Sequence, residues 1–184
     1  MKPVLMIHEI TDQLFELPLQ DYVLTFDDGL YSQYYHFDRF RDIPTEKIFF
    51  ISSNIVCQGG QSTEFPDCRT AHKKAMNENY EDYMTIDQIR ELMQYPDVTI
   101  GGHSHSHFDV SHMALTHKVD FLKFDTALML SWFEHNLGIH VDHFCYPYNN
   151  DYSHIYTSIL KQHGITHFYG SERIPAECLF TSPT

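Results

Sequence analysis

Two adjacent aspartates, Asp27 and Asp28, directly follow an apolar run at residues 22–26 and precede Gly29. The pattern predicts a buried strand that brings both carboxylates to its carboxyl end, where α/β proteins place their catalytic groups. Neighbouring carboxylates repel each other unless a cation or a shared proton relieves the repulsion. Successive residues leaving a strand point in different directions, so one acid can bind a metal while the other faces a substrate. The alternative for Asp-Asp-Gly is an ordinary turn that caps a helix.

A cluster of histidines lies further along the chain, in Gly101-Gly102-His103-Ser104-His105-Ser106-His107. On a helical turn, residues four apart share a face, so His103 and His107 would be able to bind one metal ion. In an extended segment, His103, His105 and His107 would share a face instead. We favour the turn because the two glycines indicate that the preceding strand has ended. The spacing alone is a weak sign, since the chain contains 14 histidines.

Apolar runs predict strands, and periodic segments between them predict helices. Strands are expected at about residues 3–8, 21–26, 47–52, 97–101, 140–145 and 165–169. Helices are expected at about 30–41, 85–95, 111–137 and 150–163, the second of them opening on the capping box Thr85-Ile86-Asp87-Gln88. Such alternation implies a parallel sheet with helices outside, in a barrel-like or doubly wound α/β fold.

The length of 184 residues suits a single domain covering residues 1–184. A loop insertion is expected at about 54–83, where Gly59-Gly60, Pro66 and two cysteines interrupt the alternation. This insertion is either a plain surface excursion or a segment that covers a site. None of the four cysteines forms a CxxC pair. Cys57 and Cys68 could close a small loop, but without a visible leader we expect free thiols.

The composition excludes some classes of partner. The net charge is −13 with only 12 Lys and Arg residues, so a phosphate-neutralising surface for nucleic acid is not expected. An anionic membrane surface is disfavoured for the same reason. We see neither an apolar stretch of membrane-spanning length nor a signal peptide, and therefore expect a cytoplasmic protein.

Three segments together resemble a known family. Thr25-Phe26-Asp27-Asp28-Gly29 is similar to the first motif of the polysaccharide deacetylases with a NodB homology domain, carbohydrate esterase family 4. His103-Ser104-His105-Ser106-His107 resembles their second motif, H-[S/T]-x-x-H, and Phe144-Cys145-Tyr146-Pro147-Tyr148 resembles their third, of the F-R-P-P-Y type. The motifs occur in the family's order, and the similarity spans about residues 3–175.

The resemblance implies a distorted (β/α) barrel and metal-dependent removal of acetyl groups from N-acetylated sugars. It implies that Asp28, His103 and His107 bind a divalent ion, usually zinc, and that Asp27 is the catalytic base. It also implies that the backbone N–H of Tyr148 helps to hold the oxyanion. Two imidazoles and one carboxylate are independently suited to a hydrolytic metal site with an open position, although cobalt, nickel and iron fit the same ligands.

The chain departs from the family pattern in ways that affect the site. Cys145 stands where the third motif has an arginine that orients the base, and we suggest that Arg173 replaces it. No D-x-x-D-W-like segment appears. The late L-x-H motif with its general acid is also missing, and Ile165-Thr166-His167 matches it only loosely, which makes His167 a candidate acid. We therefore expect a barrel that is short or open at its C-terminal side.

These residues favour a metal-dependent hydrolase that removes N-acetyl groups from an amino sugar in a polysaccharide or glycan precursor. The alternatives are an amidohydrolase for a non-sugar amide on the same scaffold and a catalytically weak metal- or sugar-binding protein. Tyr146 and Tyr148 are candidates for a sugar subsite, because aromatic rings stack on pyranose faces, with plain packing as the alternative. His8 ends the first expected strand and could point to the edge that carries the site, but we favour a core or solvated histidine. The oligomeric state is not indicated.

Overall fold

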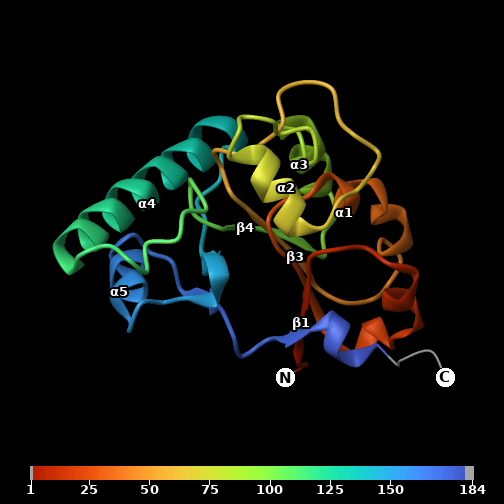
Figure 1. Cartoon of the computed structure of the whole chain (residues 1–184). Helices are drawn as coiled ribbons and strands as arrows, with labels where there is room; N and C mark the ends of the chain where they lie inside the picture. The colour runs from red at the N-terminus through yellow and green to blue at the C-terminus, as the bar shows by residue number, and fades with distance from the viewer. Residues whose placement is uncertain (1, 181–184) are drawn as a thin grey trace.

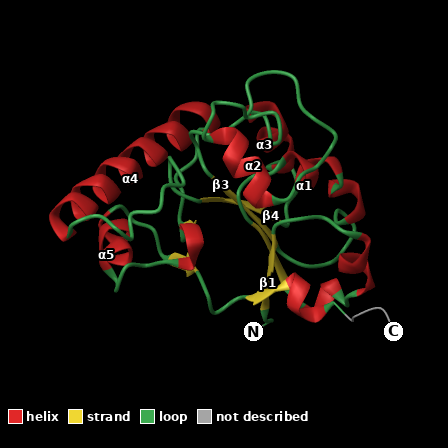
Figure 2. Cartoon of the chain, viewed as in Figure 1, coloured by secondary structure: helices red, strands yellow, loops and turns green. Residues whose placement is uncertain are grey.

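The computed structural model of the chain describes residues 2–180, and its centre is one curled sheet of seven parallel strands. The order across the sheet is β6-β5-β4-β3-β2-β1-β7. The strands are β1 (Val4–Ile7), β2 (Val23–Phe26), β3 (Lys47–Ile51), β4 (Val98–Gly102), β5 (His143–Cys145), β6 (His167–Tyr169) and β7 (Ile174–Pro175). The sheet curls into a half-barrel that is open between β6 and β7 (Figure 2). The predicted distorted (β/α) barrel, open at its C-terminal side, is thereby confirmed.

The strands form where the sequence places short apolar runs. All residues of β3 are buried, because a parallel sheet is covered on both faces. The register pairs Ile7 with Phe26 and Phe26 with Phe49, so the first three strands end at one edge of the sheet. β7 was not predicted, since a two-residue strand containing proline gives almost no pattern and can be only an edge strand.

Helices cover the sheet in two groups (Figure 1). They are α1 (Tyr31–Tyr35), α2 (Cys68–Ala75), α3 (Ile86–Leu92), α4 (Leu115–Leu137) and α5 (Ile155–Gln162). α1, α2 and α3 lie on one side in the figure, and α4 and α5 lie together on the other. The predicted capping box of α3 is present, with the Thr85 side chain accepting from the Gln88 N–H and the Gln88 side chain accepting from the Thr85 N–H. Among the described residues, no helix is both long and apolar enough to cross a membrane.

The two glycines before the histidines belong to β4, which corrects the expectation that the strand ends before them. They are required by close packing. A Cβ on Gly101 would lie 2.6 Å from the Phe50 ring, and one on Gly102 would lie 2.7 Å from the sulfur of Met129 on α4. β4 can therefore bring the histidines to the same edge of the sheet as Asp27.

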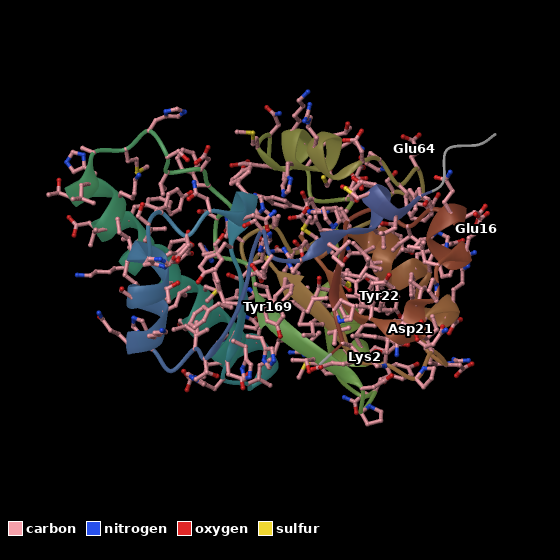
Figure 3. The ribbon with its side chains drawn as sticks, turned by 90° about the horizontal axis from the view of Figure 1, so that it is seen from below. Lys2, Glu16, Asp21, Tyr22, Glu64 and Tyr169 are labelled. Carbon is pink, nitrogen blue, oxygen red and sulfur yellow. The ribbon has the colours of Figure 1, made fainter. Side chains whose placement is uncertain are left out.

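The opposite edge of the sheet, at the amino ends of the strands, carries hydrogen bonds made by Lys2. Lys2, Asp21 and Tyr22, which precede the first two strands, lie together there when the molecule is seen from below (Figure 3). The Lys2 ammonium donates to the Gln20 carbonyl at 2.6 Å and to the Thr45 hydroxyl at 3.2 Å. These bonds fix the amino ends of the strands and leave the carboxyl ends to form the site.

Candidate metal centre and acid pair

The acid pair sits at the carboxyl end of β2, as predicted. Asp27 and Asp28 are both buried, at 2% and 3% exposure. Asp28 and Gly29 adopt left-handed backbone conformations, each with φ of 74°. This tight turn directs the two carboxylates to different partners, in line with the division of roles that adjacent acids allow.

Asp28, His103 and His107 meet at one point. The Nε2 atoms of the two histidines lie 3.1 Å apart, and Asp28 Oδ1 lies 3.1 Å from His103 Nε2 and 3.2 Å from His107 Nε2. Donor atoms bound tetrahedrally to one zinc ion at about 2.0 Å are about 3.3 Å apart. The three atoms therefore form a triangle of the size that a small divalent cation requires.

The hydrogen-bond pattern also fits a cation. His103 Nδ1 lies 2.8 Å from the Cys145 carbonyl, which can only accept, so that nitrogen carries a proton. In the neutral ring Nε2 then has a lone pair directed at Asp28 Oδ1, and this contact is favourable only with a cation between the two atoms or with a second proton on the ring. Burial would raise the pKa of Asp28, but hydrogen bonds and charge from His103 and His107 outweigh it and lower this pKa well below its usual range. The donor set fits a divalent metal.

The loop between the histidines is held by side chains, and it is not the helical turn that we predicted. Ser104 and His107 have positive φ values of 66° and 53°, and the Ser104 hydroxyl accepts from the His107 N–H at 2.8 Å. Asp125 of α4, which is buried, accepts from the N–H groups of His105 and Ser106 at 2.8 and 3.0 Å. The His105 ring pairs with Ser53 at 2.8 Å, so the extended arrangement with three convergent imidazoles does not form.

Arg173 reaches Asp27 from the residue just before β7. Its two terminal nitrogens donate to the two Asp27 oxygens, each at 2.7 Å, and Nη1 also donates to the Thr25 hydroxyl at 3.0 Å. Burial would raise the pKa of Asp27, but the charge and hydrogen bonds of Arg173 outweigh it and lower this pKa. The structure thus brings together Asp27 and the arginine that the sequence suggested as its partner.

Cys145 occupies the space beside this ion pair. Its sulfur lies 3.0 Å from Arg173 Nη2 and donates to Asp27 Oδ2 at 3.4 Å. Burial and the nearby Asp27 charge raise the pKa of the Cys145 thiol well above its ordinary value. Asn149 adds an acceptor for Arg173 Nη2 at 3.1 Å. All four cysteines are free thiols, as expected.

The acids and histidines form the floor of a cavity of about 360 Å³. One wall is α2, from the predicted insertion, so this segment covers the site. His72 of α2 stacks on His107 with ring centroids 4.1 Å apart, and its Nε2 lies 3.7 Å from Asp28 Oδ1. Burial, together with nearby His107 and His103, lowers the pKa of His72 to about 4 despite the Asp28 charge. His72 was not predicted from the sequence, because nothing in the local pattern ties residues 68–75 to the motifs.

Both predicted tyrosines line this cavity in different ways. Tyr148 has a left-handed backbone (φ 57°), is 57% exposed, and donates from its hydroxyl to the His107 carbonyl at 3.2 Å. Tyr146 is only 7% exposed, bonds to the Thr157 hydroxyl and packs on Phe144 and Tyr156. Tyr148 is therefore the ring available to a ligand, whereas Tyr146 is mainly a packing residue.

His167 does not lie in the site, which corrects its assignment as a candidate acid. It opens β6 at the amino end of the strand, is exposed, and stacks on His143 with centroids 4.2 Å apart. β5 and β6 are parallel and pair His143 with His167, so the carboxyl end of β6 is two residues further on. Asp27 and Asp28 lie at the opposite edge of the sheet, which His167 cannot reach.

His8 lies in the site instead, contrary to its interpretation as a core or solvated residue. It follows β1, lines the cavity, and places Nε2 3.8 Å from Asp27 Oδ2 and 3.9 Å from Asp28 Oδ2. Burial would lower the pKa of His8, but the Asp27 and Asp28 charges outweigh it and raise this pKa. Its position directly after the first strand was the available signal, because parallel strands bring their carboxyl ends together.

No protein-family model matches the chain, and no curated protein matches it in sequence. Solved structures do match its fold. IcaB from Ammonifex degensii aligns over 98% of this chain and 91% of its own at 18% identity, with a TM-score of 0.67. The BpsB deacetylase domain from Bordetella bronchiseptica aligns over 95% and 94% at 13% identity, with a TM-score of 0.66.

A third solved structure also has a similar fold. BC0361, a polysaccharide deacetylase from Bacillus cereus, aligns over 86% of this chain and 54% of its own at 14% identity, with a TM-score of 0.58. Identities this low establish a shared fold, and the residues of the site must carry the argument for activity.

Proposed function

We propose that this chain, which has the fold of the NodB-type polysaccharide deacetylases, is a zinc-dependent hydrolase that removes N-acetyl groups from an amino sugar in a polysaccharide or glycan precursor. The observation that carries the proposal is the convergence of Asp28, His103 and His107 beside a separate, arginine-bound Asp27. A metal triad alone suits many proteins. A second buried carboxylate adjacent to it is what amide hydrolysis needs.

Each group in the site has a distinct task. Asp28, His103 and His107 would hold the ion, which when bound supplies Lewis-acid chemistry to the acetamide carbonyl and acidifies a water molecule. Asp27, kept ionised by Arg173, accepts the proton of the attacking water. The geometry of the bidentate pair fixes the Asp27 carboxylate in one orientation, so it does not have to reorganise during the reaction.

The remaining tasks fall to groups around the cavity. The backbone N–H of Tyr148, in its left-handed turn, is the proposed donor to the oxyanion. The departing amine needs a proton, and His8 replaces His167 as the proposed donor because its Nε2 lies within 4 Å of both acids. The exposed Tyr148 ring offers a face for the sugar.

The alternative of a catalytically weak metal- or sugar-binding protein rests on the missing arginine of the third motif and on the absent late motifs. Arg173 makes the contact for which an arginine at position 145 would be needed, and this favours a catalytically equipped site. A non-sugar amide remains the rival substrate class, and activity measurements separate the two.

The test is hydrolysis by protein of defined metal content. We expect the chelated protein to release no acetate from chitooligosaccharides and the zinc-reloaded protein to release it. Asp27→Asn should retain zinc and lose at least about 100-fold in kcat, the usual contribution of a general base. The matched control is Asp120→Asn on the exposed face of α4, which should behave as the unmodified protein. Full activity of Asp27→Asn, or hydrolysis of small acyl amides in preference to sugars, would refute the proposal.

A further inference from the structure

The helix α2 presents one face to the cavity, and that face is cationic. Arg69, His72, Lys73 and Met76 follow the i, i+3, i+4, i+7 spacing of a single helical face, and all four line the cavity. The other face carries Ala71 and Ala75, which pack into a small apolar cluster. The orientation of α2 is therefore fixed by packing, and its charged face points at the place where a substrate must enter.

The two cations have no partner within the described part of the protein. Neither Arg69 nor Lys73 forms an ion pair there, whereas the adjacent Lys74 pairs with Glu81 at 2.9 Å and Asp82 at 3.1 Å. Of the basic residues that form no ion pair within residues 2–180, Arg69 and Lys73 are the two that line this cavity.

Carboxylates next to α2 and in the cavity make hydrogen bonds or ion pairs with other groups. Asp67 caps α2 by accepting from the Thr70 N–H at 2.8 Å, and Glu9 accepts from the Cys68 N–H at 2.8 Å. Inside the cavity, Asp27 is neutralised by Arg173, and Asp28 belongs to the metal triad. The positive charge of α2 is thus left for a ligand.

We propose that the substrate is an anionic glycan, in which a carboxylate or phosphate group beside the reacting N-acetylated sugar is held by Arg69 and Lys73. This inference rests on the deacetylase function proposed above and narrows its substrate class. A guanidinium recognises both kinds of oxyanion with two parallel hydrogen bonds, and the ammonium adds a point charge one helical turn away. Met76, 80% exposed, and Tyr148, 57% exposed, supply apolar surface for the sugar rings.

The net negative charge of the whole protein makes the positive face of α2 more important for binding an anionic substrate. A net charge of −13 repels an anionic polymer at long range, so a local positive face at the cavity is needed to bind one. Contacts of this exposed kind act on substrate capture and weaken as salt is added. The preference for an anionic substrate is accordingly expected in kcat/KM and in its dependence on ionic strength.

The experiment compares two substrates that differ only in charge, chitotetraose and chitotetraose carboxylated at C6. We expect the zinc-loaded protein to favour the carboxylated form in kcat/KM by about fivefold at low salt, the size expected for two exposed charge contacts. At about 1 M salt, where the screening length falls to about 3 Å, the ratio should approach one.

Variants test whether α2 is the cause. The double variant Arg69→Gln/Lys73→Gln should lose the preference for the carboxylated substrate. The matched control Lys123→Gln/Lys161→Gln removes two exposed charges from α4 and α5, away from the cavity, and should keep the preference. Equal loss in both double variants, or an unchanged ratio in Arg69→Gln/Lys73→Gln, would overturn the inference.

Failure of the deacetylase proposal gives a different result from failure of this one. If neither oligosaccharide is hydrolysed, the proposed function falls. Titration calorimetry of the same two oligosaccharides against the zinc-loaded protein then decides the inference separately. Tighter binding of the carboxylated form, lost in Arg69→Gln/Lys73→Gln, supports it. Equal binding, or no binding of the carboxylated form, overturns it.

Discussion

Replacing Arg173 by glutamine should destabilise the protein strongly, because it leaves Asp27 as a buried charge without its partner. Asp27 is 2% exposed, and both of its oxygens accept from Arg173 at 2.7 Å. Removing one member of a buried ion pair costs about 3–5 kcal/mol. For a chain of this size that corresponds to a decrease in melting temperature of about 6–20 °C. Differential scanning calorimetry of chelated protein measures it without any contribution from bound metal.

The destabilisation caused by Arg173→Gln should depend on pH. In the native protein the pKa of Asp27 is lowered, so the pair contributes stability above the ordinary pKa of an aspartate, and this is lost as the pH falls through the folded-state pKa. In Arg173→Gln, burial dominates and raises the pKa of Asp27, so the variant is most destabilised when this carboxylate must be ionised. The difference in melting temperature should therefore shrink between about pH 7 and pH 5.

A double-mutant cycle separates the ion pair from general damage at the site. Asp27→Asn/Arg173→Gln should be more stable than Arg173→Gln alone, because it no longer buries a lone charge. Arg41→Gln is the matched control, since Arg41 is a surface arginine paired with the exposed Asp38. The reasoning is refuted if Arg173→Gln melts within about 2 °C of Arg41→Gln, a difference of less than about 1 kcal/mol.

Three further outcomes are expected. Zinc at 100 times its dissociation constant should stabilise the native protein by about 2.7 kcal/mol, or about 5–11 °C in melting temperature. The same zinc concentration should not raise the melting temperature of His107→Ala. An equal shift in both proteins would contradict zinc binding by Asp28, His103 and His107. Asp125→Asn should weaken zinc binding about 10–100-fold, measured in competition with a coloured chelator. The control Asp120→Asn, at an exposed position of the same helix, should leave the zinc affinity unchanged. Equal affinities in the two variants would show that the histidine loop needs no support from α4. Iodoacetamide should modify the exposed Cys178 and spare Cys145, whose pKa is raised by burial and by the neighbouring carboxylate; mass spectrometry showing comparable labelling would contradict the buried placement.

Much of the fold and the metal triad could be predicted from local sequence because each feature has a local cause. Apolar runs at the predicted positions become β1 to β6, and the capping box at Thr85 starts α3. The parallel arrangement then places the carboxyl ends of β2 and β4 at the same edge of the sheet, on either side of β3, where Asp28 and the two histidines can meet.

The remaining site residues depend on tertiary packing. Arg173 could be suggested only because a motif arginine was missing, and His72 reaches the site through the packing of α2, which no local pattern specifies. Asp125 did leave a signal. It lies on the same helical stripe as Leu122 and Met129, and a carboxylate on an apolar stripe implies a buried partner, here the N–H groups of the histidine loop. His167 failed because its short motif gives no information about which end of a strand it occupies.

The ion pair between Asp27 and Arg173 joins an early and a late part of the chain. Asp27 and Arg173 are 146 residues apart, and the arginine directly precedes β7, a two-residue edge strand that pairs with β1. Edge segments with so few ladder bonds open locally at low free-energy cost, and amide exchange detects such openings. Each opening of β7 away from β1 would move the Arg173 guanidinium away from Asp27. Asp27, beside the proposed metal ligands, would then lose its ion-pair partner and its fixed orientation. In the mechanism that we propose, a weakened contact between β7 and β1 would therefore lower activity while the three motifs stayed in place.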